Sequence, residues 1–155
     1  MAGKSKSFPQ ANSIPLVLKM LSIINTNKDI SKNDIALMLG IVPRQVDYYL
    51  GVLYFFELIS INNDLTLKGR FISDPVIDEV DKLKIFKNIM VEHPVFKYIN
   101  DYIEDNKEIP KVNLIALYIN EYYVFSKSTL FRRASTVKSW FEYFKENRVY
   151  GEIPK

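Results

Sequence analysis

The chain has 155 residues, of which 48% are hydrophobic and 14% aromatic, enough to bury the core of one domain or of two small ones. Its 21 basic and 18 acidic residues leave a formal charge of +3, so composition alone does not establish a polyanionic partner. The absence of cysteine excludes a disulfide framework and a thiolate metal site, and five glycines in the whole chain favour a mostly α fold over a turn-rich β-sandwich.

No apolar stretch approaches the ~18 residues that span a bilayer, and the amino terminus lacks the apolar core of a signal peptide. A chain without cysteine also suits a reducing compartment. We therefore expect a soluble cytoplasmic protein with no membrane partner.

The chain begins with residues 1–14, which we expect to form a flexible arm because they are mostly small, polar and basic. An apolar helix should then start at Pro15, since proline suits the first turn of a helix. A helix with this many apolar residues must be packed against other elements on most of its circumference. Its apolar residues are Leu16, Leu18, Met20, Leu21, Ile23 and Ile24.

Residues 31–55 predict two helices joined by a tight turn. Ser31, with Asp34 three residues later, is an acidic form of the capping box that begins a helix. Gly40 is typical of a helix end, and Pro43 is typical of the first turn of the next helix. The apolar stripe of this second helix has helical spacing and comprises Val46, Tyr49, Leu50 and Leu53.

Two short β-prone runs, 58–61 and 65–67, flank the turn-forming triplet 62–64 and predict a β-hairpin wing. Consecutive breakers at 73–75 predict a domain boundary. Residues 15–73 should therefore form a winged helix-turn-helix unit. The second helix of such a unit commonly lies in the DNA major groove.

Residues 74–155 predict a further helical unit. The spacing of Val46, Tyr49, Leu50, Leu53, Leu58 and Ile59 recurs 91 residues later as Val137, Trp140, Phe141, Phe144, Val149 and Tyr150. This repeat predicts a second winged-helix-like unit, so the expected fold is mostly α, with tandem winged helix-turn-helix units and short β-hairpin wings. A simpler interpretation is that any two amphipathic helices share a 3.6-residue period.

A resemblance to a known family is carried by the stretches LGIVPRQVDYYLGVLYFFELI, LTLKGR and STLFRRASTVKSWFEYF. They resemble the tandem winged-helix recognition region of type II, especially type IIS, restriction endonucleases and related restriction-associated proteins. The resemblance covers roughly residues 15–150 and rests on patterns of residue class. It implies a DNA-reading part that works with a nuclease domain or subunit, as a recognition fragment or a separate DNA-binding subunit.

Candidate DNA contacts fall into three groups. On the outer face of the second predicted helix, Arg44 can pair with guanine and Gln45 with adenine, and Tyr48 lies beside them. Lys68 and Arg70 follow the predicted wing and could reach the phosphate backbone. The third group is a basic and hydroxylic cluster that suits phosphates and base edges, and it comprises Arg132, Arg133, Ser135, Thr136, Lys138 and Ser139.

These candidate contacts also have simpler interpretations. Asp47 shares the face with Arg44 and repels phosphate unless it accepts from cytosine or orients that arginine. Each basic group could be an ordinary solvated helix face. Trp140 could belong to a base-stacking platform, but it falls on the apolar stripe, so we predict that it is a core residue.

The chain carries no glycine-rich phosphate loop, zinc-ligand set or serine nucleophile elbow. The run 105–107 has the acidic-x-Lys spacing of a nuclease, yet it lies in a polar helix exit rather than on a strand. His93, which precedes Pro94, suits a helix boundary better than a general base. We therefore expect duplex DNA binding without catalysis, metal or cofactor. The alternatives are a protein-interaction or oligomerisation module and a transcriptional regulator.

Overall fold

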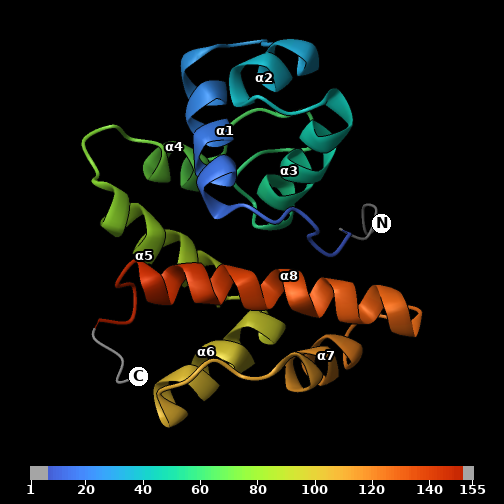
Figure 1. Cartoon of the computed structure of the whole chain (residues 1–155). Coiled ribbons are helices and arrows are strands. Elements are labelled where there is room, and N and C mark those ends of the chain that lie inside the picture. The colour runs from blue at the N-terminus through green and yellow to red at the C-terminus, as the bar shows by residue number, and fades with distance from the viewer. Residues whose placement is uncertain (1–6, 152–155) are drawn as a thin grey trace. The chain divides into compact units, whose positions relative to one another are not determined.

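The computed structural model describes residues 7–151, and within that range it contains eight α-helices and no β-strand (Figure 1). The helices are α1 (Ile14–Thr26), α2 (Lys32–Leu39), α3 (Pro43–Phe55), α4 (Leu67–Ile72), α5 (Glu79–Met90), α6 (Pro94–Asn106), α7 (Val112–Asn120) and α8 (Lys127–Glu146). The chain divides into two compact units after Ile77, four residues beyond the expected boundary at residue 73. The mostly α prediction is confirmed.

Unit 1, described from residue 7 to residue 77, is built on α1, α2 and α3, which contact one another (Figure 1). The Ser31 hydroxyl accepts from the Asp34 backbone N–H at 3.1 Å, which confirms the predicted start of α2. Gly40 ends this helix with a left-handed φ of 70°, a conformation that a Cβ atom would strain. The two helices and the turn between them thus follow from local capping.

The segment before α1 is partly packed. Phe8 is only 4% exposed, and its ring lies edge-on to that of Phe55 with centroids 6.0 Å apart. The backbone N–H of Ser13 donates to the phenolic oxygen of Tyr49 on α3 at 3.2 Å. In the predicted flexible arm, residues 7–14 are therefore held against unit 1, while residues 1–6 lie outside the described range.

The predicted β-hairpin wing of unit 1 is wrong. The two β-prone runs form a single antiparallel bridge, between Ile59 and Leu65, and no strand. A tight turn closes between them, in which the Ser60 N–H donates to the Asp64 carbonyl at 2.8 Å. One residue pair is too short to make a wing that could extend over DNA.

The short helix α4 explains why the bridge does not extend. The Thr66 side chain accepts from the Gly69 N–H at 3.1 Å and so begins α4 one residue after the bridge. Gly69 packs directly against the Leu58 backbone carbonyl, which also accepts from the Thr66 N–H at 3.1 Å. Because Thr66 caps α4, the residues from Leu67 onward are helical and cannot continue a second strand.

Unit 2, described from residue 78 to residue 151, is built on α5 to α8, and α8 is its longest helix (Figure 1). Trp140 on α8 has no exposed surface and stacks on Phe96 of α6 with centroids 6.1 Å apart. Phe86 of α5 meets Phe144 of α8 edge-on at 6.4 Å. The prediction that Trp140 is a core residue is confirmed.

The second predicted winged-helix-like unit is also not formed as expected. The helices α7 and α8 are separated by residues 121–126, whereas residues 40–42 suffice between α2 and α3. Val149 and Tyr150 lie in a turn rather than in a strand. Residues 152–155, where the wing would continue, lie outside the described range.

The 91-residue repeat instead marks a shared way of ending a helix. At the end of α3, the Leu58 N–H donates to the Leu53 carbonyl at 2.8 Å around Glu57, which has a left-handed φ of 60°. At the end of α8, the Val149 N–H donates to the Phe144 carbonyl at 3.0 Å around Arg148, which has a left-handed φ of 65°. This is the Schellman arrangement, which brings two apolar residues five positions apart into contact. The apolar pair after each helix therefore indicates a helix cap, not a strand.

Candidate nucleic-acid interface

The candidate interface is the outward side of α3, positioned by the turn 40–42. The Ile41 N–H donates to the Ala36 carbonyl at 3.0 Å, so the chain leaves α2 through a fixed cap. Pro43 then begins α3, where a missing N–H costs nothing. Val46 is fully buried, so the side chains on either side of it in the sequence face away from the core.

The predicted base-reading residues of α3 are accessible. Arg44 and Gln45 are exposed at the amino end of the helix, and Tyr48 is half-buried one turn later. Tyr49 is buried and fixes the helix against the segment before α1. The first turn of α3 therefore presents a guanidinium and an amide to solvent from a packed helix.

Gln45 also has a structural role that the sequence analysis missed. Its Oε1 accepts from the Val42 N–H at 3.3 Å and so caps the start of α3. Glutamine at the third helical position is a known signal for this reciprocal cap. The bond orients the side chain, and its NH₂ group remains the part that would address adenine.

The negative charge on this face is compensated. Lys32 Nζ of α2 lies 2.8 Å from a carboxylate oxygen of Asp47, and both side chains are about half exposed. Asp47 therefore pairs with a lysine from the neighbouring helix. This ion pair differs from the two predicted roles of Asp47, which are to orient Arg44 or to accept from cytosine.

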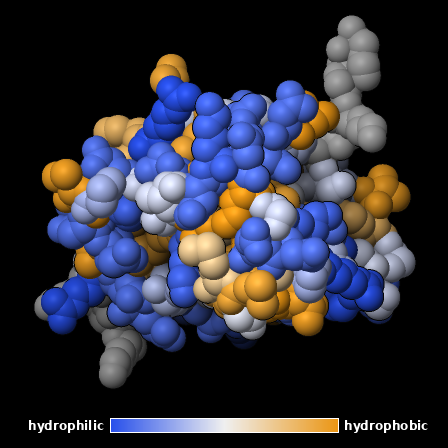
Figure 2. Space-filling view, turned by 90° about the horizontal axis from the view of Figure 1, so that it is seen from above, coloured by the Kyte–Doolittle hydropathy of each residue, from blue (hydrophilic) through white to orange (hydrophobic). Residues whose placement is uncertain are grey.

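Apolar side chains stand close to the same turn. Leu37 is 80% exposed, Met38 49% and Val42 57%. Figure 2, which views the molecule from the α2 side, shows hydrophobic patches that interrupt a mostly hydrophilic surface. The exposed residues of the helix-turn-helix are thus mixed in character rather than uniformly basic.

Lys68 and Arg70, which follow the predicted wing in the sequence, lie on α4. Both are exposed. Lys68 Nζ is 3.9 Å from a carboxylate oxygen of Glu57, at the limit of an ion pair. Both cations therefore lie on a six-residue helix, and their contact with the phosphate backbone stays a prediction.

The structure separates the two arginines of the predicted α8 cluster. Arg132 is exposed and donates to Thr129 Oγ1 at 3.2 Å. Arg133 is half-buried, and its guanidinium carbon lies 5.8 Å from the ring centre of Phe125. Neighbouring positions on a helix point about 100° apart, so the two cations cannot face one phosphate together.

The hydroxyl residues of α8 differ in exposure. Ser139 Oγ donates to the Thr136 carbonyl at 2.6 Å, and both residues are half-buried. Ser135 is exposed, and Lys138 is half-buried. By helical spacing, Arg132, Ser135, Thr136 and Ser139 lie on one side of α8, whereas Arg133 and Lys138 lie to either side of that stripe, so the structure brings only part of the predicted cluster together.

His93 is a helix-capping residue, as predicted. Its Nδ1 accepts from the Val95 N–H at 3.3 Å at the start of α6, and its Nε2 lies 3.1 Å from the Tyr123 oxygen. Burial lowers the pKa of His93 below the ordinary 6.5. A neutral ring with the proton on Nε2 satisfies both contacts.

A model of a family described as a domain of unknown function, DUF7226, matches residues 16–147. The chain belongs to this family. The match begins in α1 and ends after α8, so the DUF7226 domain comprises both units. No curated protein sequence and no solved structure matches the chain.

Three further features of this DUF7226 domain bear on its function. Within residues 7–151, no three His, Asp, Glu or Cys side chains are placed to hold a metal ion. The nuclease-like run 105–107 closes α6, and its Lys107 has a left-handed φ of 57° at the helix end. No helix in the described range has the length and apolar character to cross a bilayer.

Proposed function

We propose that this domain binds duplex DNA through α2 and α3. The observation that supports the proposal is the exposed first turn of α3, which follows a three-residue turn and carries Arg44 and Gln45. A helix held in this way can enter the major groove with its amino end toward the bases. Arg44 would then address guanine, and the free amide group of Gln45 would address adenine.

The charge of unit 1 predicts modest electrostatic affinity. Residues 7–77 carry six basic and six acidic side chains. With about one or two phosphates neutralised, the logarithm of the binding constant should fall with the logarithm of salt with a slope of about −1 to −2. Base contacts rather than general attraction must therefore supply most of the discrimination.

The resemblance to restriction endonuclease recognition regions suggests the biological context of this DNA binding. In such a setting the DUF7226 domain reads the site, and a nuclease domain or subunit cuts the DNA. The domain itself takes no part in catalysis. A transcriptional regulator would use the same contacts on α3.

The direct test is fluorescence anisotropy with random duplexes over a salt series, followed by selection of a preferred site. Arg44→Ala should weaken binding to the selected site by about 1–3 kcal/mol and relax discrimination at one base. Lys19→Ala, which removes an exposed cation from α1, is the matched control and should leave discrimination intact. Equal effects of both variants on every duplex would refute base reading by Arg44.

A protein-interaction or oligomerisation module is the second candidate. The observation that favours it is the exposure of Leu37, Met38 and Val42 around the same turn, since apolar exposure at one place is typical of contact surfaces. Sedimentation of the wild type and of Leu37→Ser tests it. Self-association that Leu37→Ser abolishes, together with no DNA binding at any salt concentration, would favour this candidate.

A further inference from the structure

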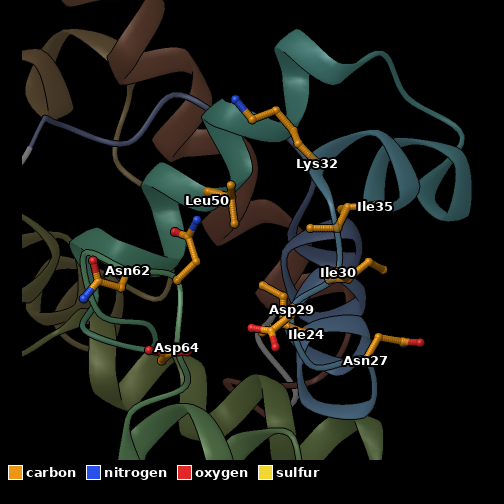
Figure 3. Close-up of a pocket in the computed structure, with 10 residues that line it drawn as sticks. Ile24, Asn27, Asp29, Ile30, Lys32, Ile35, Leu50, Asn62 and Asp64 are labelled. Atoms are coloured by element: carbon orange, nitrogen blue, oxygen red, sulfur yellow. The ribbon is translucent and has the colours of Figure 1, made fainter.

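Unit 1 contains a cavity of about 250 Å³ beside α3 (Figure 3). Three elements line it: the end of α1 with the α1–α2 connector, α3, and the 60–64 turn. The lining residues are Ile24, Asn27, Asp29, Ile30, Lys32, Ile35, Leu50, Asn62, Asn63 and Asp64.

The floor of the cavity is aliphatic. Ile35 is buried, while Ile24, Ile30 and Leu50 are half-buried and keep part of their surface accessible. In Figure 3, Leu50 reaches down from α3 into the space between the two walls. A ligand bound here would bury apolar surface that is otherwise exposed to solvent.

The rim of the cavity is rich in hydrogen-bond acceptors. Asp29 points from the α1–α2 connector toward the open space, and Asp64 lies on the facing turn (Figure 3). Neither carboxylate forms an ion pair with another residue in the range 7–151. Both Asp29 and Asp64 are exposed.

The remaining polar groups do not offset this charge. Lys32 also lines the cavity, and its ammonium group pairs with Asp47 of α3 at 2.8 Å (Figure 3). The Asn27 amide nitrogen donates to the Ile23 carbonyl at 3.0 Å and to Thr26 Oγ1 at 2.9 Å. The cavity therefore combines an aliphatic floor with two unneutralised carboxylates on opposite walls.

We propose that this cavity binds a small aliphatic amine in its protonated form. The ammonium group would donate to Asp29 and Asp64, and the alkyl chain would lie against Ile24, Ile30 and Leu50. At about 250 Å³ the cavity is below the usual range for drug-sized ligands, so the alkyl chain is short. Two carboxylates above an apolar floor suit an organic cation better than a metal ion, which requires more oxygen ligands.

The inference goes beyond the proposed DNA binding and does not depend on it. A bound amine would contact α3, the α1–α2 connector and the 60–64 turn together. It would therefore stabilise the folded state of unit 1 whether or not α3 also contacts DNA.

The test is a titration of the full chain, without DNA, with n-butylammonium, followed by backbone amide NMR and by thermal unfolding. Shifts of amide signals confined to residues 24–35, 50 and 60–65, with a rise in the melting temperature, are expected. Neutral n-butanol, which has the same alkyl chain, should bind at least about tenfold more weakly because charge-assisted hydrogen bonds are lost. Equal binding of the alcohol would overturn the proposal.

Two variants locate the ammonium. Asp29→Asn and Asp64→Asn should each weaken butylammonium binding about tenfold. Asparagine tolerates the left-handed φ of 60° at position 29, so the fold should persist. Asp34→Asn, which removes an exposed carboxylate of unit 1 outside the cavity, is the matched control. Unchanged affinity in Asp29→Asn, or calcium binding in place of amine binding, would overturn the assignment.

Discussion

The ammonium of Lys32 lies 2.8 Å from the carboxylate of Asp47, and this ion pair joins the first turn of α2 to the outward side of α3. It links two residues that the sequence places fifteen positions apart. Through it, Asp47 is partly neutralised on the face that carries Arg44. The pair also engages the ammonium group of Lys32, a residue that lines the cavity of unit 1.

Asp47→Asn should strengthen binding to all duplexes several-fold. The substitution removes a charge that repels phosphate and frees Lys32 for a phosphate, so the salt dependence should steepen by about one unit of slope. Loss of an exposed pair costs only about 0.2–1 kcal/mol of stability. Anisotropy over a salt series measures the first effect and urea unfolding the second. Weaker binding in Asp47→Asn would show that the carboxylate itself contacts DNA.

Gly69→Ala should destabilise unit 1 by about 1–3 kcal/mol, as overpacking does. A Cβ atom at position 69 would collide with the backbone oxygen of Leu58 and would lie 3.2 Å from the Leu65 side chain. Gly51→Ala is the matched control, because its Cβ would meet no atom within 4 Å. That control should instead stabilise α3 by up to about 1 kcal/mol. Urea unfolding compares the two, and similar effects would contradict the close packing of α4.

Tyr150→Phe should cost about 1–3 kcal/mol, because it leaves a buried acceptor unsatisfied. The Tyr150 hydroxyl donates to Asn100 Oδ1 at 2.7 Å, and Asn100 is only 8% exposed. Burial raises the pKa of Tyr150, so the phenol stays protonated as the donor. Tyr102→Phe, which removes an exposed 3.4 Å bond to Glu108, should change stability little. Equal losses in the two variants would contradict the importance of the buried bond.

Protonation of His93 should lower the free energy of unfolding as the pH falls below about 6.5. Burial lowers the pKa of this histidine in the folded state, so below 6.5 the unfolded chain binds a proton that the folded chain excludes. The contribution is complete above 6.5 and is lost progressively as the pH falls toward the lowered value. Urea unfolding of the wild type and of His93→Asn, which keeps a capping side chain, isolates it. If the free energies of unfolding of the wild type and of His93→Asn changed equally with pH, the proposed role of His93 would be refuted.

Arg148→Gly should stabilise unit 2 by about 0.5–1 kcal/mol. Arg148 has a left-handed φ of 65°, which costs a residue with a Cβ atom more than it costs glycine. Glu142→Gly, inside α8 one turn before its last residue, is the matched control and should destabilise by about 1 kcal/mol. Thermal unfolding of both variants measures the difference. Destabilisation by Arg148→Gly would contradict the left-handed helix end.

The helices of unit 1 could be predicted because their starts and ends depend on neighbours a few residues away. Ser31, Gly40 and Pro43 place α2, the turn and α3 through bonds that span three to five residues. The 91-residue repeat was a real pattern, but it was assigned to strands. It marks two Schellman helix ends, and these also bring apolar residues together at fixed spacing.

The sequence by itself determined α1, α2 and α3, the helix ends at Ser31 and Gly40, and the outward positions of Arg44 and Gln45, because backbone hydrogen bonding within a helix is local. Only the tertiary structure decided the rest. The β-prone residues of 58–67 form strands only if two runs pair over several residues, and α4 begins too soon after Leu65 for that pairing. The Lys32–Asp47 pair, the Tyr150–Asn100 bond and the cavity join side chains from separate elements. Their approach depends on how the helices pack, which spacing along the chain does not specify.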